Sequence, residues 1–227
     1  MKLQRHPVSI DIINFAPDNN NKRERHGCLL PNTIRSLFIG PSNCGKTSLL
    51  ISLILSPVGL RFENLYIFSK SLYQPKYQYL DKIFKGLKHI GFHLFNNNCE
   101  IDPLDELEDN SIFIFDDVAL VQQDPAREIF SMGRHKNLDA FYLSQSYAHI
   151  GKHLIRDNCN HLAIFRQDDT NLKHIYNDHV NSDMSFDQFK KMCNLCWSDK
   201  FGFLVIDKDL EMNRGKYRKG LSDFFIL

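Results

Sequence analysis

The chain has 227 residues, of which 43% are hydrophobic and 24% are charged, and its formal net charge is +1. This composition is ordinary for a globular protein, and the net charge by itself does not indicate a nucleic-acid binder. No apolar run approaches the roughly 20 residues needed to span a bilayer, so we expect no membrane partner. The length suits one α/β domain over 1–227, with a core at about 34–207, an N-terminal extension at 1–33 and a basic C-terminal segment at 208–227.

The N-terminal stretch MKLQRHPVSIDIINF lacks the apolar region of a secretory signal. Six cysteines are scattered along the chain, and a disulfide at Cys44 would obstruct the glycine-rich loop that contains it. We therefore expect a reducing, intracellular setting. The pair Cys193-x-x-Cys196 fits either a metal site or, in the interpretation we prefer, reduced cysteines packed beside Trp197.

The first motif in chain order is LFIGPSNCGKTSLL, at residues 37–50. It contains the complete pattern G-x-x-x-x-G-K-[ST], preceded by an apolar run and followed by a helical pattern that runs to Leu55. In this context backbone N–H groups and the helix N-terminus hold phosphates, the lysine reaches the β- and γ-phosphates, and the next hydroxyl ligates Mg²⁺. The loop is therefore predicted to bind a nucleoside triphosphate, with Thr47 as a Mg²⁺ ligand. The expected nucleotide-binding residues are Gly40, Pro41, Ser42, Asn43, Cys44, Gly45, Lys46, Thr47 and Ser48.

Apolar runs and helical patterns alternate after this loop. The run IFIF at 112–115 is continuously apolar, which is typical of a central parallel strand buried on both faces. The alternation predicts an α/β fold, a three-layer P-loop NTPase with a mostly parallel central sheet. The expected strands lie at 65–68, 90–95, 112–115, 139–145, 161–165 and 201–206, and the expected helices after the loop helix lie at 77–87 and 124–135.

Two acids, Asp116 and Asp117, follow the apolar run directly. A carboxylate at the carboxyl end of such a strand lies beside the phosphate loop. There Asp116 can hold Mg²⁺ through a water, and Asp117 can polarise the water that attacks the γ-phosphate. The alternative interpretation is a pair of solvent-facing loop acids.

The order of the motifs separates two branches of P-loop proteins. At least one strand, at 65–68, lies between the phosphate-loop strand and the strand that ends at Asp116. In the branch with an additional catalytic strand, the strand after the acids inserts between these two and carries a polar sensor at its end. Here that strand is AFYLSQ, so we expect Gln145 to sense the γ-phosphate, although taken alone it could be a loop residue.

The stretches GRHKNLDAFYLSQSY and KHLIRDNCNHLAIFR resemble the FtsK–HerA superfamily of DNA-pumping ATPases. Within that superfamily the chain looks most like the poxvirus-type genome-packaging ATPases of large DNA viruses, virophages and polinton-like elements. The resemblance covers roughly 37–166. Its most specific parts are the paired acids, the G-R-x-x-x-L block at 133–138 and the Ser144-Gln145 strand end.

The resemblance implies a role for Arg134, which in related motors reaches into the site of a neighbouring subunit. A guanidinium there neutralises the charge that builds up on the γ-phosphoryl group. Alternatively, Arg134 caps the C-terminus of its own helix. Arg156 and Arg166 are further candidates for phosphate sensing or an inter-subunit contact. Basic residues near 22–26, in 70–76 and in 208–219 are candidates for DNA contacts, although the last cluster fits a solvated tail equally well.

The function that this resemblance implies is DNA packaging by a ring of roughly five or six identical subunits. ATP hydrolysis, with Mg²⁺ as cofactor, would drive double-stranded DNA into a preformed capsid through Lys46, Asp117, Gln145 and Arg134. The implied partners are double-stranded DNA, the other subunits and a capsid or portal-vertex protein. The implied location is the host cytoplasm or nucleus at the site of virion assembly.

Two other functions remain open at this stage. A nucleotide or small-molecule kinase would place its metal-binding strand next to the phosphate-loop strand, which the order of motifs disfavours. An ATP-dependent DNA-binding switch for assembly would share the same site residues and differ in hydrolysing slowly.

Overall fold

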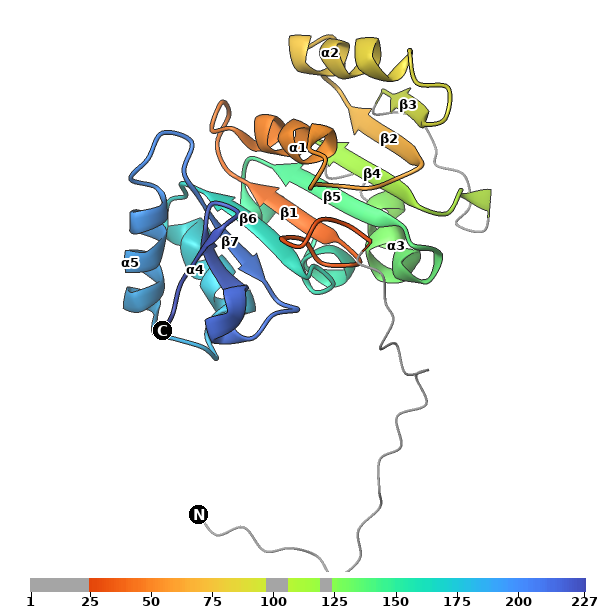
Figure 1. Ribbon diagram of the computed structural model, residues 1–227. Helices are drawn as coiled ribbons and strands as arrows, with labels where there is room; N and C mark the ends of the chain where they lie inside the picture. Colours follow the sequence, from red (N-terminus) through yellow and green to blue (C-terminus); the bar gives the residue numbers. More distant parts are fainter. Residues whose placement is uncertain (1–24, 97–105, 119–123) are drawn as a thin grey trace, which may run out of the picture.

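The computed structural model of the chain describes residues 25–96, 106–118 and 124–227, which form a sheet flanked by helices (Figure 1). Within these ranges nine strands form one sheet, in the order β3-β2-β4-β5-β1-β6-β7-β8-β9. The six strands from β3 to β6 in that order are parallel, and β7, β8 and β9 continue the sheet in antiparallel fashion. No helix in the described ranges is both long and apolar enough to cross a membrane.

The parallel strands are rich in aromatic and β-branched residues, which favour extended backbone. In β4 the apolar side chains alternate between the two faces: Ile112 and Ile114 belong to one core cluster, and Phe113 and Phe115 to the other. The strands are β1 Arg35–Ile39, β2 Asn64–Ser69, β3 Gly91–Phe95, β4 Ser111–Asp116, β5 Asp139–Ser144, β6 His161–Phe165, β7 Phe203–Asp207, β8 Tyr217–Lys219 and β9 Asp223–Phe224.

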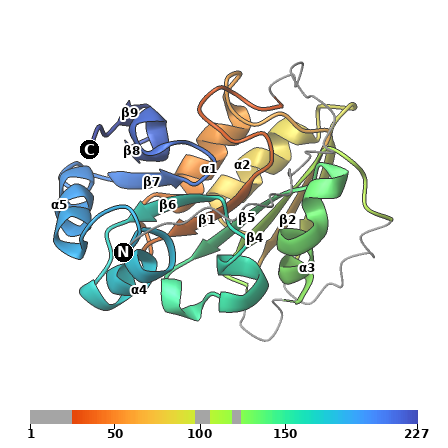
Figure 2. The same cartoon turned by 90° about the horizontal axis from the view of Figure 1, so that it is seen from below.

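Helices cover both faces of the sheet, as Figure 2 shows. The first two, α1 Lys46–Leu55 and α2 Pro75–Phe84, pack on one face. The opposite face carries α3 Asp124–Met132, α4 Asp169–His179 and α5 Phe186–Cys196. Short helical turns span Gly133–Lys136, Tyr147–His149, Lys152–Arg156 and Met212–Lys216.

The fold class predicted from the sequence is confirmed, and so is the position of the additional strand. β5 lies between β1 and β4 and pairs with both in parallel. The helices α4 and α5 were not predicted from the sequence, although a capping residue precedes each of them. Asp168 accepts the N–H of Asn171, and Ser185 forms a capping box with Gln188, so these two positions carried a readable start signal.

The basic C-terminal segment is folded as part of the sheet. Lys216 and Lys219 form ion pairs with Asp183 and Asp199 at 2.5 and 2.7 Å, and the buried Arg218 pairs with a carboxylate of β7. Several of the charges counted there as a DNA surface or a solvated tail therefore neutralise acids of the same chain. Of the expected N-terminal extension, residues 1–24 lie outside the described ranges.

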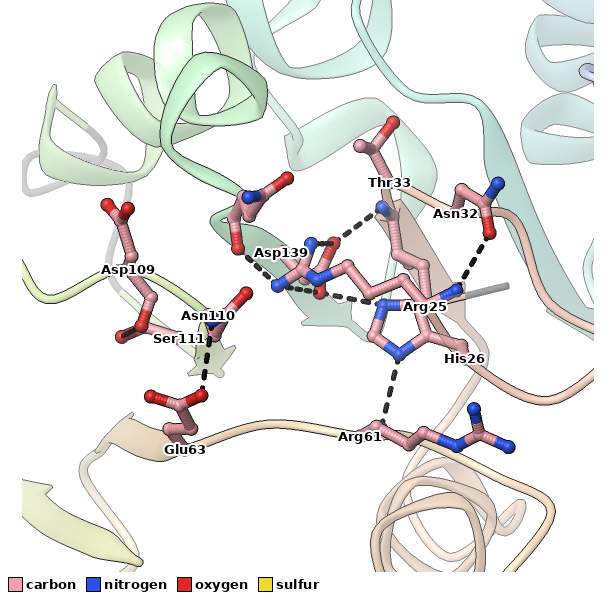
Figure 3. Close-up of polar contacts among 12 residues, drawn as sticks. Arg25, His26, Asn32, Thr33, Arg61, Glu63, Asp109, Asn110, Ser111 and Asp139 are labelled. Atoms are coloured by element: carbon pink, nitrogen blue, oxygen red, sulfur yellow. Dashed lines mark hydrogen bonds and ion pairs between the residues drawn. The ribbon is translucent and has the colours of Figure 1, made fainter. Parts of the chain in front are cut away.

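The described end of the N-terminal extension is held at the amino ends of the parallel strands by the buried Asp139, which opens β5 (Figure 3). The Asp139 carboxylate accepts from Ile34 N–H at 2.8 Å and from His26 Nε2 at 2.9 Å, and it pairs with the Arg25 guanidinium at 3.1 Å. The Nδ1 atom of His26 accepts Arg61 N–H at 3.2 Å, so the ring carries its hydrogen on Nε2. This Asp139 cluster ties three distant segments together.

Candidate nucleotide-binding site

The loop between β1 and α1 has the backbone shape of a phosphate-binding loop. Asn43 and Gly45 have positive φ angles of 61° and 115°, and the second of these is a conformation that glycine adopts without strain. Gly45 precedes α1, and no side chain caps the amide groups of that helix end. Exposed amides at a helix N-terminus, together with the helix dipole, make this loop a site for an anion.

Gly40 fixes the start of the loop to the two neighbouring strands. Its N–H donates to the carbonyl oxygen of Ser144, at the end of β5, over 3.1 Å. A Cβ atom at this position would lie 2.6 Å from Cβ of Phe165 and 2.7 Å from Sγ of Cys44, so only glycine fits. The phosphate loop is therefore packed directly against the carboxyl ends of β5 and β6.

The Lys46 side chain folds back into its own loop. Its Nζ donates to the carbonyl oxygens of Gly40 at 2.5 Å and Pro41 at 3.0 Å, and the residue is buried. These contacts hold the ammonium group within the curve of the loop. A phosphate group in this curve would lie within reach of both the loop amides and a positive charge.

Asp116 is the last residue of β4, at the same edge of the sheet as the phosphate loop. Its Oδ2 accepts a hydrogen bond from the hydroxyl of Tyr77, a fully buried residue of α2. Burial raises the pKa of the Asp116 carboxyl, and the Tyr77 hydrogen bond and the Lys46 charge act in the opposite direction. Burial and the nearby Asp116 charge raise the pKa of the Tyr77 hydroxyl, so Tyr77 stays a hydrogen-bond donor to the carboxylate.

Asp117 follows with a positive φ of 55°, which turns the chain sharply after the strand. Its N–H donates to the carbonyl oxygen of Leu143 in β5 at 3.3 Å, and the residue is exposed. The two acids therefore differ in environment: Asp116 is half-buried and hydrogen-bonded, whereas Asp117 faces solvent next to the additional strand.

One cavity of about 210 Å³ brings the predicted site residues together. Lys46, Thr47, Asp116, Asp117 and Gln145 all line it, although they come from three separate stretches of the sequence. Gln145 is exposed and follows β5 directly. The full lining is Ser42, Asn43, Cys44, Gly45, Lys46, Thr47, Ser69, Ser71, Gln74, Lys76, Asp116, Asp117, Leu143, Ser144 and Gln145.

Five residues from the end of β2 to the first turn of α2 belong to this site, and the sequence did not identify them as nucleotide-site residues. Ser69, Ser71, Gln74 and Lys76 line the cavity, and Tyr77 contacts Asp116. Part of this stretch was expected to grip DNA. No motif spacing identifies these residues, because they reach the site through the pairing of β2 with β4, which places Ser69 opposite Asp116.

The oxygen atoms of Thr47 and Asp116 suit a magnesium ion. A hydroxyl and a carboxylate lining the same cavity as a phosphate-binding loop are the hard oxygen donors that Mg²⁺ takes, usually together with water and substrate phosphates. The donor set thus fits the ion that the sequence predicts.

The three candidate arginines lie in different surroundings. Arg134 belongs to the turn Gly133–Lys136, before the start of β5 and therefore at the end of the sheet away from the phosphate loop. The description does not extend to its side chain. Arg156 is mostly buried, pairs with Asp178 at 3.0 Å and packs 4.7 Å from the centre of the Tyr147 ring. Arg166 is exposed and follows β6, on the phosphate-loop side.

The cysteine pair near the end of the chain shows no sign of a metal site. Cys193 and Cys196 are free thiols on the buried face of α5, and burial raises the pKa of the Cys196 thiol to about 12. Among the residues that the structure describes, no group of three histidine, cysteine or acidic side chains could hold a metal ion. The pair packs in the core, with Trp197 partly buried against the same cluster.

The strand order and the site together define a P-loop nucleoside triphosphatase of the class with an additional strand between the phosphate loop and the acidic strand. Residues 21–200 match the sequence family described as Poxvirus A32 protein. The chain belongs to this family, which confirms the viral resemblance expected from its sequence. A comparison with curated protein sequences finds no significant match.

The chain is also similar in fold to solved structures of viral genome-packaging NTPases. The chain is similar to the genome packaging NTPase B204 of Sulfolobus turreted icosahedral virus 2 in complex with sulfate, with a TM-score of 0.59 and 13% identity over 87% of this chain and 99% of the other. The same NTPase with AMPPCP gives 0.54 and 12% over 79% and 95%. The DNA-packaging ATPase B204 of Sulfolobus turreted icosahedral virus gives 0.53 and 12% over 82% and 95%. At these identities the similarity concerns the fold.

Proposed function

We propose that the chain is an ATPase that drives double-stranded DNA into a viral or virus-like capsid. The observation that carries this proposal is the single cavity in which a phosphate loop, two acids and Gln145 meet, with β5 inserted between β1 and β4. Membership of the poxvirus A32 family and the fold shared with packaging NTPases support it.

The residues of the cavity divide the chemistry between them. The loop amides and Lys46 bind the β- and γ-phosphates and compensate the charge that develops between them. Thr47 and Asp116 hold Mg²⁺, which supplies charge neutralisation to the phosphates. Asp117 orients the attacking water and accepts its proton, for which its exposed position at the strand end suits it.

Gln145 connects hydrolysis to the rest of the fold. The strand that precedes it is bound on one side to the phosphate-loop strand and on the other to the strand of the two acids. A hydrogen bond from the Gln145 amide to the γ-phosphate would be lost on hydrolysis. Loss of the γ-phosphate would therefore change the contacts at the end of β5 first.

The position of Arg134 favours a role in a neighbouring subunit's site. β5 runs for six residues between this turn and the cavity, which is about 16 Å of extended chain. An arginine side chain does not cover that distance, so Arg134 would serve a γ-phosphate only across a subunit interface. Such a shared site requires a ring of subunits, and the resemblance to viral packaging ATPases implies roughly five or six of them.

A kinase is the weaker candidate because its metal-binding strand would neighbour β1, where β5 lies instead. A slowly hydrolysing DNA-binding switch would share this geometry and differ in how DNA changes its turnover.

The test is steady-state ATP hydrolysis at increasing protein concentration, with and without long linear double-stranded DNA. We expect the rate per subunit to rise with concentration and again with DNA. A rate that is flat in both would contradict the motor and leave a kinase or a switch.

The shared site has its own test in the Arg134→Ala variant. It should bind nucleotide, fail to hydrolyse it, and regain part of the rate when mixed with Asp117→Asn subunits, which keep Arg134. Normal turnover of Arg134→Ala alone would show that no arginine finger acts at this position.

A further inference from the structure

A second cavity, of about 330 Å³, adjoins the phosphate loop. It lies toward β6 and β7, across β1 from the strand that ends at the two acids. Its walls come from the first turns of α1, the end of β6 and the start of β7. The lining residues are Gly45, Ser48, Leu49, Ser52, Phe165, Phe201 and Phe203. Its volume lies at the small end of the range of about 300–1,000 Å³ that is usual for ligand pockets.

Three phenylalanines, Phe165, Phe201 and Phe203, line this second cavity, which we call the aromatic cleft. Phe165 and Phe203 are register partners in the antiparallel pair of β6 and β7, and their ring centres lie 5.2 Å apart. Phe201 stands in the turn before β7 with a positive φ of 64°, an uncommon conformation for a bulky residue, and 56% of its surface is exposed. The Lys200 ammonium lies 5.1 Å from the centre of its ring. Figure 1 shows this turn at the same end of the sheet as the phosphate loop.

Gly45 joins the aromatic cleft to the nucleotide cavity, because it lines both. A Cβ atom built at Gly45 would lie 3.3 Å from the Phe165 ring and 3.5 Å from Phe201. The aromatic wall is thus in contact with the loop that holds the phosphates. Ser48, expected in the sequence to bind nucleotide, lines the aromatic cleft and not the phosphate cavity.

We propose that this aromatic cleft binds the base of the nucleotide by stacking on Phe201, with the phosphates held on the other side of Gly45. The inference rests on the proposed ATPase function and names the substrate class more closely. A nucleoside triphosphate has a polar chain at one end and a flat apolar ring at the other, which matches a polar cavity and an aromatic cavity that share the lining residue Gly45. Stacking does not distinguish between bases that present similar flat faces.

The cleft offers few groups that could read the base by hydrogen bonds. Its side-chain hydroxyls are those of Ser48 and Ser52, and Ser52 Oγ already donates to the Ser48 carbonyl at 2.9 Å. A site that reads its substrate by hydrogen bonds discriminates strongly, whereas an apolar pocket does not. The proposal therefore includes similar KM values for ATP and GTP, within about threefold, and weaker use of the smaller pyrimidines.

The test compares ATP with inorganic tripolyphosphate, which has the phosphates without the base, on the full chain. In Phe201→Ala the KM for ATP should rise about 5- to 100-fold, the range expected for loss of one aromatic–base stack. Inhibition by tripolyphosphate should stay at the wild-type level. Phe224→Ala is the matched control, because Phe224 is 55% exposed and lies in β9, outside both cavities.

Three results would overturn the proposal. The first is an unchanged KM for ATP in Phe201→Ala, and the second is an equal weakening of ATP and tripolyphosphate, which would assign Phe201 to the support of the loop. The third is a preference of more than about 100-fold for ATP over GTP in the wild type, which would require a hydrogen-bonding reader. Failure of the packaging function appears separately, as wild-type hydrolysis that DNA does not stimulate.

Discussion

Polar side chains at the two ends of the parallel strands differ in burial and in hydrogen bonding. At the amino ends, the buried Asp139 accepts hydrogen bonds from Arg25, His26 and Ile34. The buried Asn160 bonds there to the backbone of Thr33 and Arg35. At the carboxyl ends, Asp117 and Gln145 stand exposed at the rim of a cavity. The polar residues at the amino ends are hydrogen-bonded within the chain. Those at the carboxyl ends are exposed, so they can bind a ligand.

This difference shows that stability and chemistry are separated along the strands. A buried and fully paired carboxylate holds segments in place, and its loss leaves its partners unsatisfied. An exposed carboxylate beside a phosphate loop contributes little to folding and can act on a substrate. Substitutions at the two ends should therefore affect different measurements.

The largest effect on activity is expected from Asp117→Asn. The variant should bind ATP as the wild type does, while kcat falls about 100- to 10,000-fold, the range for loss of a general base. The matched control is Asp109→Asn, an exposed acid just before β4 at the amino end of the strand. If both variants lose activity to the same extent, or neither does, the two ends do not differ in the way described.

Asp139→Ala should have the largest effect on stability. It leaves Arg25, His26 and Ile34 N–H without their acceptor in a buried position, and we expect the free energy of unfolding to fall by about 3–5 kcal/mol. Urea denaturation of the nucleotide-free protein measures it. Asp157→Ala, which breaks an exposed pair with His153, should cost less than about 1 kcal/mol. Equal losses would mean that the Asp139 cluster does not anchor the fold.

A pH-dependent effect is expected at Asp207, which ends β7 and pairs with Arg218 at 3.2 Å. Burial raises the pKa of Asp207 to about 6, although the Arg218 charge opposes this. The folded protein then holds a proton that the unfolded chain releases near pH 4, so this contribution to stability is present below pH 4 and is lost as pH rises to about 6.

Asp207→Asn removes this dependence. The unfolding free energy of the wild type relative to Asp207→Asn should therefore fall by about 1–3 kcal/mol between pH 4 and pH 7. Denaturation curves at several pH values measure it, with the exposed Asp223→Asn as the control. A relative stability that rises with pH would have the wrong sign for a buried carboxyl with a raised pKa.

The smallest effect is expected from Tyr77→Phe, which removes one hydrogen bond to Asp116 without touching the phosphate loop. Loss of a hydrogen bond to a charged group should lower kcat about 2- to 10-fold and raise the Mg²⁺ concentration needed for half the maximal rate. Tyr79→Phe, on the exposed face of the same helix, is the control. A lower melting temperature with an unchanged Mg²⁺ requirement would make Tyr77 a structural residue only.

Much of the site at the carboxyl ends could be predicted from the sequence because its residues belong to short motifs that are contiguous in the chain. The glycine and lysine spacing of the phosphate loop needs only a strand before it and a helix after it. The apolar run before Asp116 implied a buried strand, and the next strand implied the place of Gln145. Each inference used neighbours within a few residues, which a single sequence supplies.

The contacts at the amino ends could not be predicted, because they join distant residues. His26 and Asp139 lie 113 positions apart, and Arg218 donates to the Leu29 carbonyl across 189 positions. The C-terminal segment is basic by composition. Its ion pairs with acids of other segments, which the sequence does not show, determine how much of that positive charge is left unpaired. Tyr77 was missed for the same reason, since only the packing of α2 brings it to Asp116.

The central claim, that the carboxyl ends of the strands form a nucleotide site that folding does not depend on, is tested most directly by calorimetric binding of ATP with Mg²⁺ to Lys46→Ala. Loss of a charged hydrogen-bond donor to phosphate should weaken binding about 10- to 100-fold, with the urea midpoint of the nucleotide-free protein close to that of the wild type. Wild-type affinity in this variant would contradict the account, because the ammonium held in the loop would then have no part in binding the nucleotide.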